Sequence, residues 1–156
     1  KSWALAKTNG VARKYFLILS QSDQLRANAF LDEWTLEIPN SPEPLRKKGT
    51  ILLGENEIDQ AIPLFESALK LAPKDVISLN NLAWLYQEKG DERAIEISKQ
   101  AHKLAPKSGA VADTYGWILI QNNKKELGIK TLKIALELSP ESDEIRKHLE
   151  SATSGE

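Results

Sequence analysis

The chain has 156 residues, of which 41% are hydrophobic and 28% charged, a balance that indicates a folded domain with a substantial core rather than a disordered chain. Acidic and basic residues nearly cancel, with a net charge of −1, which argues against nucleic-acid binding. The sequence has no cysteine, which excludes disulfides, thiolate metal sites and a cysteine nucleophile.

Membrane and targeting signals are sparse. The longest apolar run, residues 15–19, is too short to cross a bilayer, so we expect no transmembrane segment in this chain. The sequence opens at Lys1 without a methionine or a signal peptide, and we therefore expect it to be part of a longer chain.

The first quarter of the chain is the least regular. We expect residues 2–7 to be the end of an incoming helix, which Asn9 and Gly10 would stop. Two more helices are predicted over residues 11–19 and 23–36. The inner stripe of the second of them is predicted to be Ala27, Leu31 and Trp34.

A helix pair follows. Ser41 is predicted to cap its first helix, with Pro42 in the first turn, where a missing N–H costs little. After a turn at Gly54, the second helix contains Pro63, which should delay its start or kink it, at roughly 3 kcal/mol if fully interior. The buried stripe of this second helix is predicted to be Ala61, Phe65 and Ala68.

Two further pairs are capped by Asp75 and Ser108. Asn123, with Glu126 three residues later, resembles a capping box. A last amphipathic helix is predicted over residues 141–150, after which the chain should fray. The predicted core of these helices is Leu79, Leu82, Ala83, Tyr86, Ala94, Ile97, Ala101, Ala112, Tyr115, Gly116, Leu119, Gly128, Leu132 and Ala135.

One stretch of the sequence occurs twice. Residues 78–90, SLNNLAWLYQEKG, align with residues 111–123, VADTYGWILIQNN, so that Trp84 matches Trp117 thirty-three residues later. Prolines that end the helix pairs recur at spacings of 34, 33 and 34 residues, at positions 39, 73, 106 and 140. Such a period is typical of a helical repeat array.

These residues resemble the tetratricopeptide repeat, whose pattern is W-x₂-L-G-x₂-Y, then A-x₃-F, then P. The likeness is close over residues 42–140 and loose over 11–41. It implies an all-α fold, a right-handed α-solenoid of antiparallel pairs with eight or nine helices. We therefore expect a single domain, part of a longer array, with a degenerate repeat at 11–41, repeats at 42–74, 75–107 and 108–140, and a capping helix at 141–150.

Within this family, residues 31–41, 79–94, 113–121 and 139–149 are similar to the C-terminal part of the exosortase-associated repeat lipoproteins of the PEP-CTERM system. The resemblance implies a bacterial envelope protein linked to exopolysaccharide production and to the sorting of surface proteins. It implies a periplasmic or envelope location, and without it a cytoplasmic location stays open.

We find no catalytic pattern in the sequence. His102 and His148 lie in different predicted helices without metal-ligand spacing to an acidic partner, and we expect His102 to pack against the following repeat. No Gly-x-Ser-x-Gly elbow or phosphate-binding glycine loop is present. We therefore predict no enzyme, no cofactor and no metal.

In this repeat family, the first helices of successive pairs line a concave groove. Trp84 and Trp117 occupy equivalent positions on adjacent first helices, with backbones ~10 Å apart, and could anchor a peptide. The alternative is that both pack internally, against the second helices or a terminal segment. The predicted groove residues are Arg46, Thr50, Asn80, Asn81, Trp84, Gln87, Asp113, Trp117 and Gln121.

The expected partner is a protein or a peptide, with no nucleic acid. The clamp that some of these repeats use for a terminal carboxylate needs five residues, of which only Arg46 and Asn81 are present. Thr50, Ala110 and Thr114 stand at the other three positions, so we do not expect that ligand. Self-association through the terminal helices and contact with polysaccharide are the alternatives.

Overall fold

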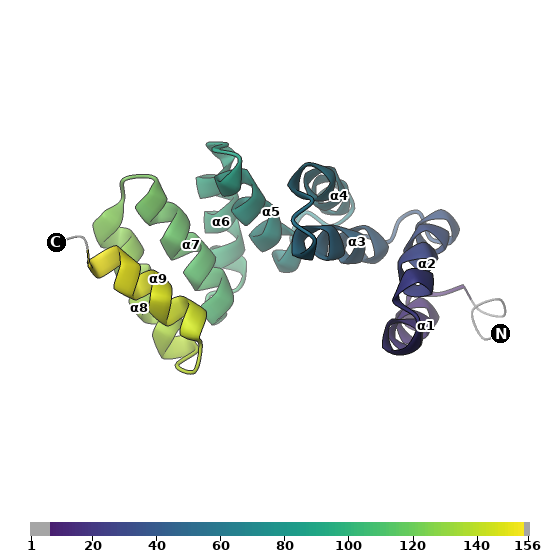
Figure 1. The fold of residues 1–156 in the computed structure, drawn as a ribbon. Coiled ribbons are helices and arrows are strands. Elements are labelled where there is room, and N and C mark those ends of the chain that lie inside the picture. Colours follow the sequence, from purple (N-terminus) through teal and green to yellow (C-terminus); the bar gives the residue numbers. More distant parts are fainter. Residues whose placement is uncertain (1–6, 155–156) are drawn as a thin grey trace. The chain divides into compact units, whose positions relative to one another are not determined.

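The computed structural model describes residues 7–154, and within them nine α-helices pack as sequential antiparallel pairs (Figure 1). The predicted all-α fold is therefore confirmed. The helix predicted over residues 2–7 falls almost entirely outside the described residues. The helices are α1 (Asn9–Ser22), α2 (Gln24–Glu37), α3 (Glu43–Gly54), α4 (Ile58–Leu71), α5 (Val76–Glu88), α6 (Arg93–Leu104), α7 (Gly109–Gln121), α8 (Lys125–Leu138) and α9 (Asp143–Thr153).

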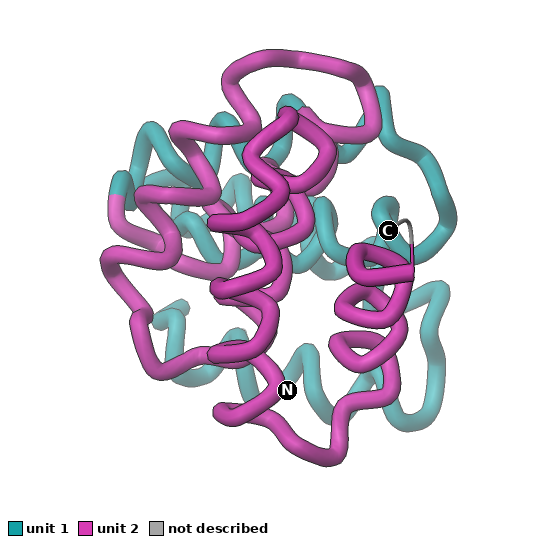
Figure 2. Tube along the Cα trace, turned by 90° about the vertical axis from the view of Figure 1, so that its left-hand side faces the viewer, with its two compact units in different colours: residues 1–73 teal, residues 74–156 magenta. Residues whose placement is uncertain are grey.

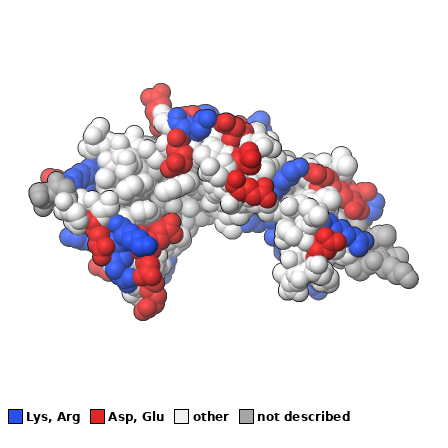
Figure 3. Space-filling model, viewed as in Figure 1, with Lys and Arg blue, Asp and Glu red and all other residues white. Residues whose placement is uncertain are grey.

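The chain forms two compact units, Lys1–Pro73 and Lys74–Glu156, which Figure 2 shows in different colours. The first contains α1 to α4 and the second α5 to α9. In the part of the chain that the structure describes, no helix is both long and apolar enough to cross a membrane. On the face shown in Figure 3, acidic and basic side chains are interspersed.

The first unit is built around large side chains. Trp34 is fully buried, with Phe30 and Leu31 beside it, and the predicted stripe of α2 is confirmed. Tyr15 of α1 meets Phe30 edge to face, with ring centroids 4.8 Å apart. The Trp34 indole N–H donates to Asn9 Oδ1 at 3.0 Å, so the polar edge of this buried ring has a partner.

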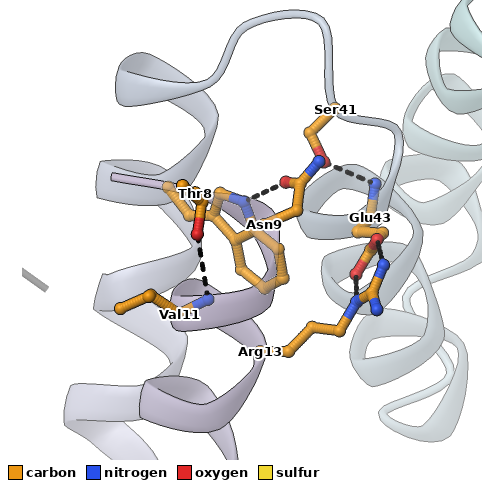
Figure 4. Close-up of polar contacts among 7 residues, drawn as sticks. Thr8, Asn9, Val11, Arg13, Ser41 and Glu43 are labelled. Carbon is orange, nitrogen blue, oxygen red and sulfur yellow. Dashed lines mark hydrogen bonds and ion pairs between the residues drawn. The ribbon is translucent and has the colours of Figure 1, made fainter. Parts of the chain in front are cut away.

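The predicted stop at Asn9 and Gly10 is wrong, because α1 begins there. Thr8 is the N-cap, and its Oγ1 accepts a hydrogen bond from the Val11 N–H at 3.3 Å (Figure 4). Asn-Gly is a common helix stop in isolation, but here Asn9 is held by Trp34 at the start of the helix.

A salt bridge joins α1 to the start of α3. The Arg13 guanidinium donates to both carboxylate oxygens of Glu43, with Nε 2.6 Å from Oε2 (Figure 4). This hydrogen bond lowers the pKa of Glu43 below its usual 4.5, against the opposing effect of burial. The N-cap of α3 is Pro42 rather than the predicted Ser41, although Ser41 Oγ still accepts from the Glu43 N–H at 3.4 Å.

Pro63 does not delay α4, which begins at Ile58. Pro63 is exposed, so its ring does not enter the core. As a proline, it lacks the N–H that would donate a hydrogen bond within the helix. The stripe Ala61, Phe65 and Ala68 is fully buried, as predicted. Phe65 packs directly on Gly49 of α3, where an added Cβ would lie 3.0 Å from the ring.

In the second unit, the predicted caps of α5 and α7 are confirmed. Asp75 Oδ2 accepts from the Ser78 N–H at 3.3 Å, and Ser108 Oγ accepts from the Val111 N–H at 3.4 Å. The capping box at Asn123 is wrong: Asn123 has a φ of 61°, and α8 starts after Lys124 without a side-chain cap. Asn123 serves the turn rather than the helix, since asparagine tolerates the left-handed conformation.

Helices α7 and α8 approach closely through two glycines. A Cβ on Gly128 would lie 2.7 Å from the Gly116 carbonyl oxygen, and one on Gly116 would lie 3.0 Å from Leu132. The predicted core of this unit is buried except at Ile97 and Tyr115, which are half-buried. Small residues at these positions let the two helix backbones meet.

The last helix is longer than predicted. α9 runs to Thr153, and Ala152 is buried near its end, so the expected fraying of the chain from Ser151 onwards is wrong for the described residues. Ile145 anchors α9 by packing with Ala112 of α7 and Ala135 of α8. This contact decides which side chains of α9 turn toward the other helices of the unit.

Candidate functional site

The predicted groove residues lie in both units. Arg46 and Thr50 belong to α3 in the first unit. Arg46 is half-buried, whereas Thr50 is exposed and donates its hydroxyl to the Arg46 carbonyl at 2.9 Å. The other seven lie on α5 and α7 in the second unit: Asn80, Asn81, Trp84, Gln87, Asp113, Trp117 and Gln121.

Trp84 and Trp117 share one neighbour, His148 of α9. The imidazole stacks on the Trp117 indole with ring centroids 4.6 Å apart and an interplanar angle of 21°. It also stacks on the Trp84 indole, at 6.3 Å and 28°. Both indoles are half-buried. Because the two indole rings contact the same imidazole, they lie on the same side of α5 and α7.

The Asp113 carboxylate holds the His148 imidazole through a hydrogen bond. The Nδ1 atom of His148 lies 2.9 Å from Asp113 Oδ1 and 3.0 Å from Oδ2, and the two side chains are only 17% and 9% exposed. The hydrogen bond to Asp113 raises the pKa of His148 above its usual 6.5, while burial opposes the rise. A protonated imidazole against two indole faces adds cation–π attraction.

The Asn and Gln side chains of the predicted groove differ in their burial and hydrogen bonds. Gln87 accepts from the Asn122 side-chain N–H at 2.8 Å and is held in place, while Gln121 is exposed. Asn80 and Asn81 are half-buried. The Oδ1 atom of Asn80 is buried, and no hydrogen-bond donor among the described residues reaches it.

His148 is the residue that sequence reasoning missed. The sequence predicts no metal or catalytic role for it, yet the fold brings its imidazole to Asp113, thirty-five positions away. Glu144 stands one helical turn before it in the sequence, a local signal that both side chains share a face. His102, by contrast, packs on the following helix pair as predicted, stacked on Tyr115 with centroids 5.3 Å apart.

The comparisons with known proteins agree with this architecture. Two tetratricopeptide repeat models match the chain, one over residues 47–75 and one over residues 64–97. No curated protein matches the sequence.

Several solved structures share the fold. MamA 41-end from Desulfovibrio magneticus RS-1 is 22% identical, with a TM-score of 0.79 over 96% of this chain and 86% of its own. The Sgt2 TPR domain from Aspergillus fumigatus is 24% identical, with a TM-score of 0.67 over 72% of this chain and 77% of its own. A mutant O-GlcNAc transferase from Thermobaculum terrenum is 23% identical, with a TM-score of 0.69 over 71% of this chain and 22% of its own. These likenesses show a tetratricopeptide-repeat-like fold.

Proposed function

We propose that this protein is a non-catalytic scaffold of the tetratricopeptide repeat type, which binds a peptide or a segment of a partner protein along the first helices of its pairs. Folds of this kind typically act as protein–protein interaction scaffolds, and the repeat-model matches support that role here. The proposed repeats are residues 42–74, 75–107 and 108–140, with the helix after them as a cap.

The observation that carries the proposal is the pair of indoles on neighbouring helices α5 and α7, which remain only half-buried although both stack on His148 of the terminal helix α9. Tryptophan is enriched among the residues that dominate interface energies. The proposed contact residues are Arg46, Thr50, Asn80, Asn81, Trp84, Gln87, Asp113, Trp117 and Gln121.

Peptides selected from a random library against the whole protein would test this. We expect the double variant Trp84→Ala with Trp117→Ala to weaken the selected peptides about 30-fold or more, because hot-spot truncations cost about 2 kcal/mol or more. Titration calorimetry gives the affinity and circular dichroism the helical content. Leu36→Ala is the matched control, since Leu36 is an exposed apolar residue of the first unit. Unchanged affinity in the double variant would refute the proposed binding face.

A second candidate function is self-association as the end of a longer repeat array. Exposed apolar side chains on the first two helices favour it: Leu17 and Ile18 on α1 are 58% and 62% exposed, and Leu25 on α2 is 85% exposed. Sedimentation velocity at rising concentration should then show a dimer that Leu17→Lys with Ile18→Lys abolishes. A strict monomer throughout would count against this function.

A more specific proposal than protein binding is a role in the bacterial envelope. It rests on the likeness of residues 79–94 and 113–121 to exosortase-associated repeat lipoproteins and would connect the protein to exopolysaccharide and surface-protein export. If the tryptophans stack on sugar rings, titration with the exported glycan should change tryptophan fluorescence in the wild type. A flat titration would leave no support for direct contact with polysaccharide.

A further inference from the structure

Three side chains of the second unit meet where α9 faces α7. Asp113 comes from α7, and Glu144 and His148 come from α9. Each offers one potential metal-ligand atom, and these atoms all lie within 4.8 Å of one another. Two of the three donors are four residues apart on one helix, the spacing by which helical metal motifs place two ligands on the same face.

The charges of the group favour a cation. Asp113 and Glu144 carry two negative charges, so the group keeps a net charge of −1 even when His148 is protonated. Asp113 is only 7% exposed and pairs with His148, so the charge that remains unbalanced is that of the exposed Glu144. A divalent ion would balance both carboxylates at once.

The imidazole is already oriented for ligation. Stacking on Trp117 and Trp84 fixes the plane of the ring, and Nδ1 faces the Asp113 carboxylate at 2.9 and 3.0 Å. Neighbours that fix the orientation of a ligating histidine are a regular part of metal sites. On binding, Nδ1 would give its proton to solvent and its lone pair to the metal.

The donor chemistry selects among metals. One imidazole nitrogen with two carboxylate oxygens would give zinc three protein ligands of the types it takes, and a water molecule would fill the fourth position. Calcium and magnesium prefer all-oxygen sites. Zinc lies about 2.0–2.2 Å from each such donor, and Glu144 is the exposed residue of the three, with the most room to adjust its side chain.

We infer that Asp113, Glu144 and His148 bind a zinc ion, or a divalent ion of similar preference, which fastens α9 to α7. The simpler arrangement is an Asp113–His148 ion pair that binds no metal. The two differ at Glu144, because the ion pair joins His148 to Asp113 whereas the metal site also uses the Glu144 carboxylate.

The experiment uses the whole protein, free of any histidine tag and stripped of metal with a chelator. Titration calorimetry with Zn²⁺ should show one saturable site per chain, and Zn²⁺ should raise the melting temperature. Glu144→Gln and His148→Gln should each weaken binding at least about tenfold. His102→Gln is the matched control and should bind as the wild type does. Cobalt should give visible absorption that Glu144→Gln weakens.

Two results would overturn the inference. The first is a wild type that shows no saturable one-to-one binding of Zn²⁺. The second is binding that persists unchanged in both Glu144→Gln and His148→Gln, which would place the ion elsewhere. Circular dichroism of the two variants confirms that a loss of binding is not a loss of fold; Glu144→Gln alters an exposed side chain and therefore stays informative if His148→Gln proves unstable.

Discussion

The α1–α2 pair of the first unit and the α7–α8 pair of the second are held together by opposite means. In the first, large side chains separate α1 from α2: Trp34 occupies a position where the repeat pattern calls for a small residue, and it is fully buried. In the second, α7 meets α8 through Gly116 and Gly128: a Cβ on Gly128 would clash, and one on Gly116 would be in tight contact. A helix pair can therefore be stabilised either by a large buried ring or by close backbone contact.

The difference also affects what each unit exposes. The α1–α2 pair leaves Leu17, Ile18 and Leu25 more than half exposed. In the second unit, α9 packs against both α7 and α8 through Ile145, and it brings His148 to the indoles. We therefore expect the α1–α2 pair to depend on one side chain, and the α7–α8 pair to depend on backbone contact and on α9.

The largest effect should come from Trp34→Ala. Removing a fully buried indole costs about 3–5 kcal/mol, and the variant also leaves Asn9 without the indole N–H. Urea unfolding gives the free energy, and hydrogen exchange gives its location, which should be α1 and α2. Trp34→Phe is the matched control and should cost less. Equal loss of protection in α7 and α8 would contradict the expectation that Trp34 stabilises the α1–α2 pair specifically.

A smaller effect, about 1–3 kcal/mol, is expected for Gly128→Ala. The new methyl group would lie 2.7 Å from the Gly116 carbonyl oxygen, so α7 and α8 must move apart. Gly54→Ala is the control, because no atom lies within 4 Å of the added Cβ. Thermal unfolding should show a lowered melting temperature for Gly128→Ala alone. If both variants melt alike, close backbone contact is not what stabilises this pair.

Much of the helix pattern could be predicted because its signals are local. Asp75 and Ser108 cap helices through bonds that span three residues, and the predicted buried stripes follow from helical periodicity. The predictions were wrong where a residue far away in the sequence determines the local conformation. Asn9 would stop a helix by itself, but the Trp34 indole, twenty-five positions away, holds it at the start of one.

The candidate site was predictable in part for the same reason. The equivalent positions of Trp84 and Trp117 follow from the repeat period. Their contact with His148 does not, because it depends on how α9 is packed, and Ile145 sets that packing. Glu144 and His148 were visible as a pair at helical spacing, but nothing local shows that Asp113 faces them.

The smallest predicted effect is a loss of stability at low pH. It compares an ion pair between residues far apart in the sequence, in the first unit, with an ion pair between near neighbours, in the second. Glu43 joins α3 to Arg13 of α1, thirty residues away, whereas Asp91 bonds Arg93 only two residues on. Hydrogen bonds to these arginines lower both pKa values. A lowered folded-state pKa contributes stability above the unfolded value, and that stability is lost as pH falls through the folded value.

The first unit should therefore lose protection against hydrogen exchange below about pH 4.5, the usual pKa of Glu43. Glu43→Gln should reduce this acid sensitivity in α1 and α3, because the substituted amide does not titrate. Asp91→Asn should change the acid response of α6 less, since an asparagine oxygen can still accept from the Arg93 N–H as Asp91 Oδ1 does, and only a local pair is removed. Acid profiles in which Asp91→Asn has the larger effect would show that sequence separation does not rank these two contacts.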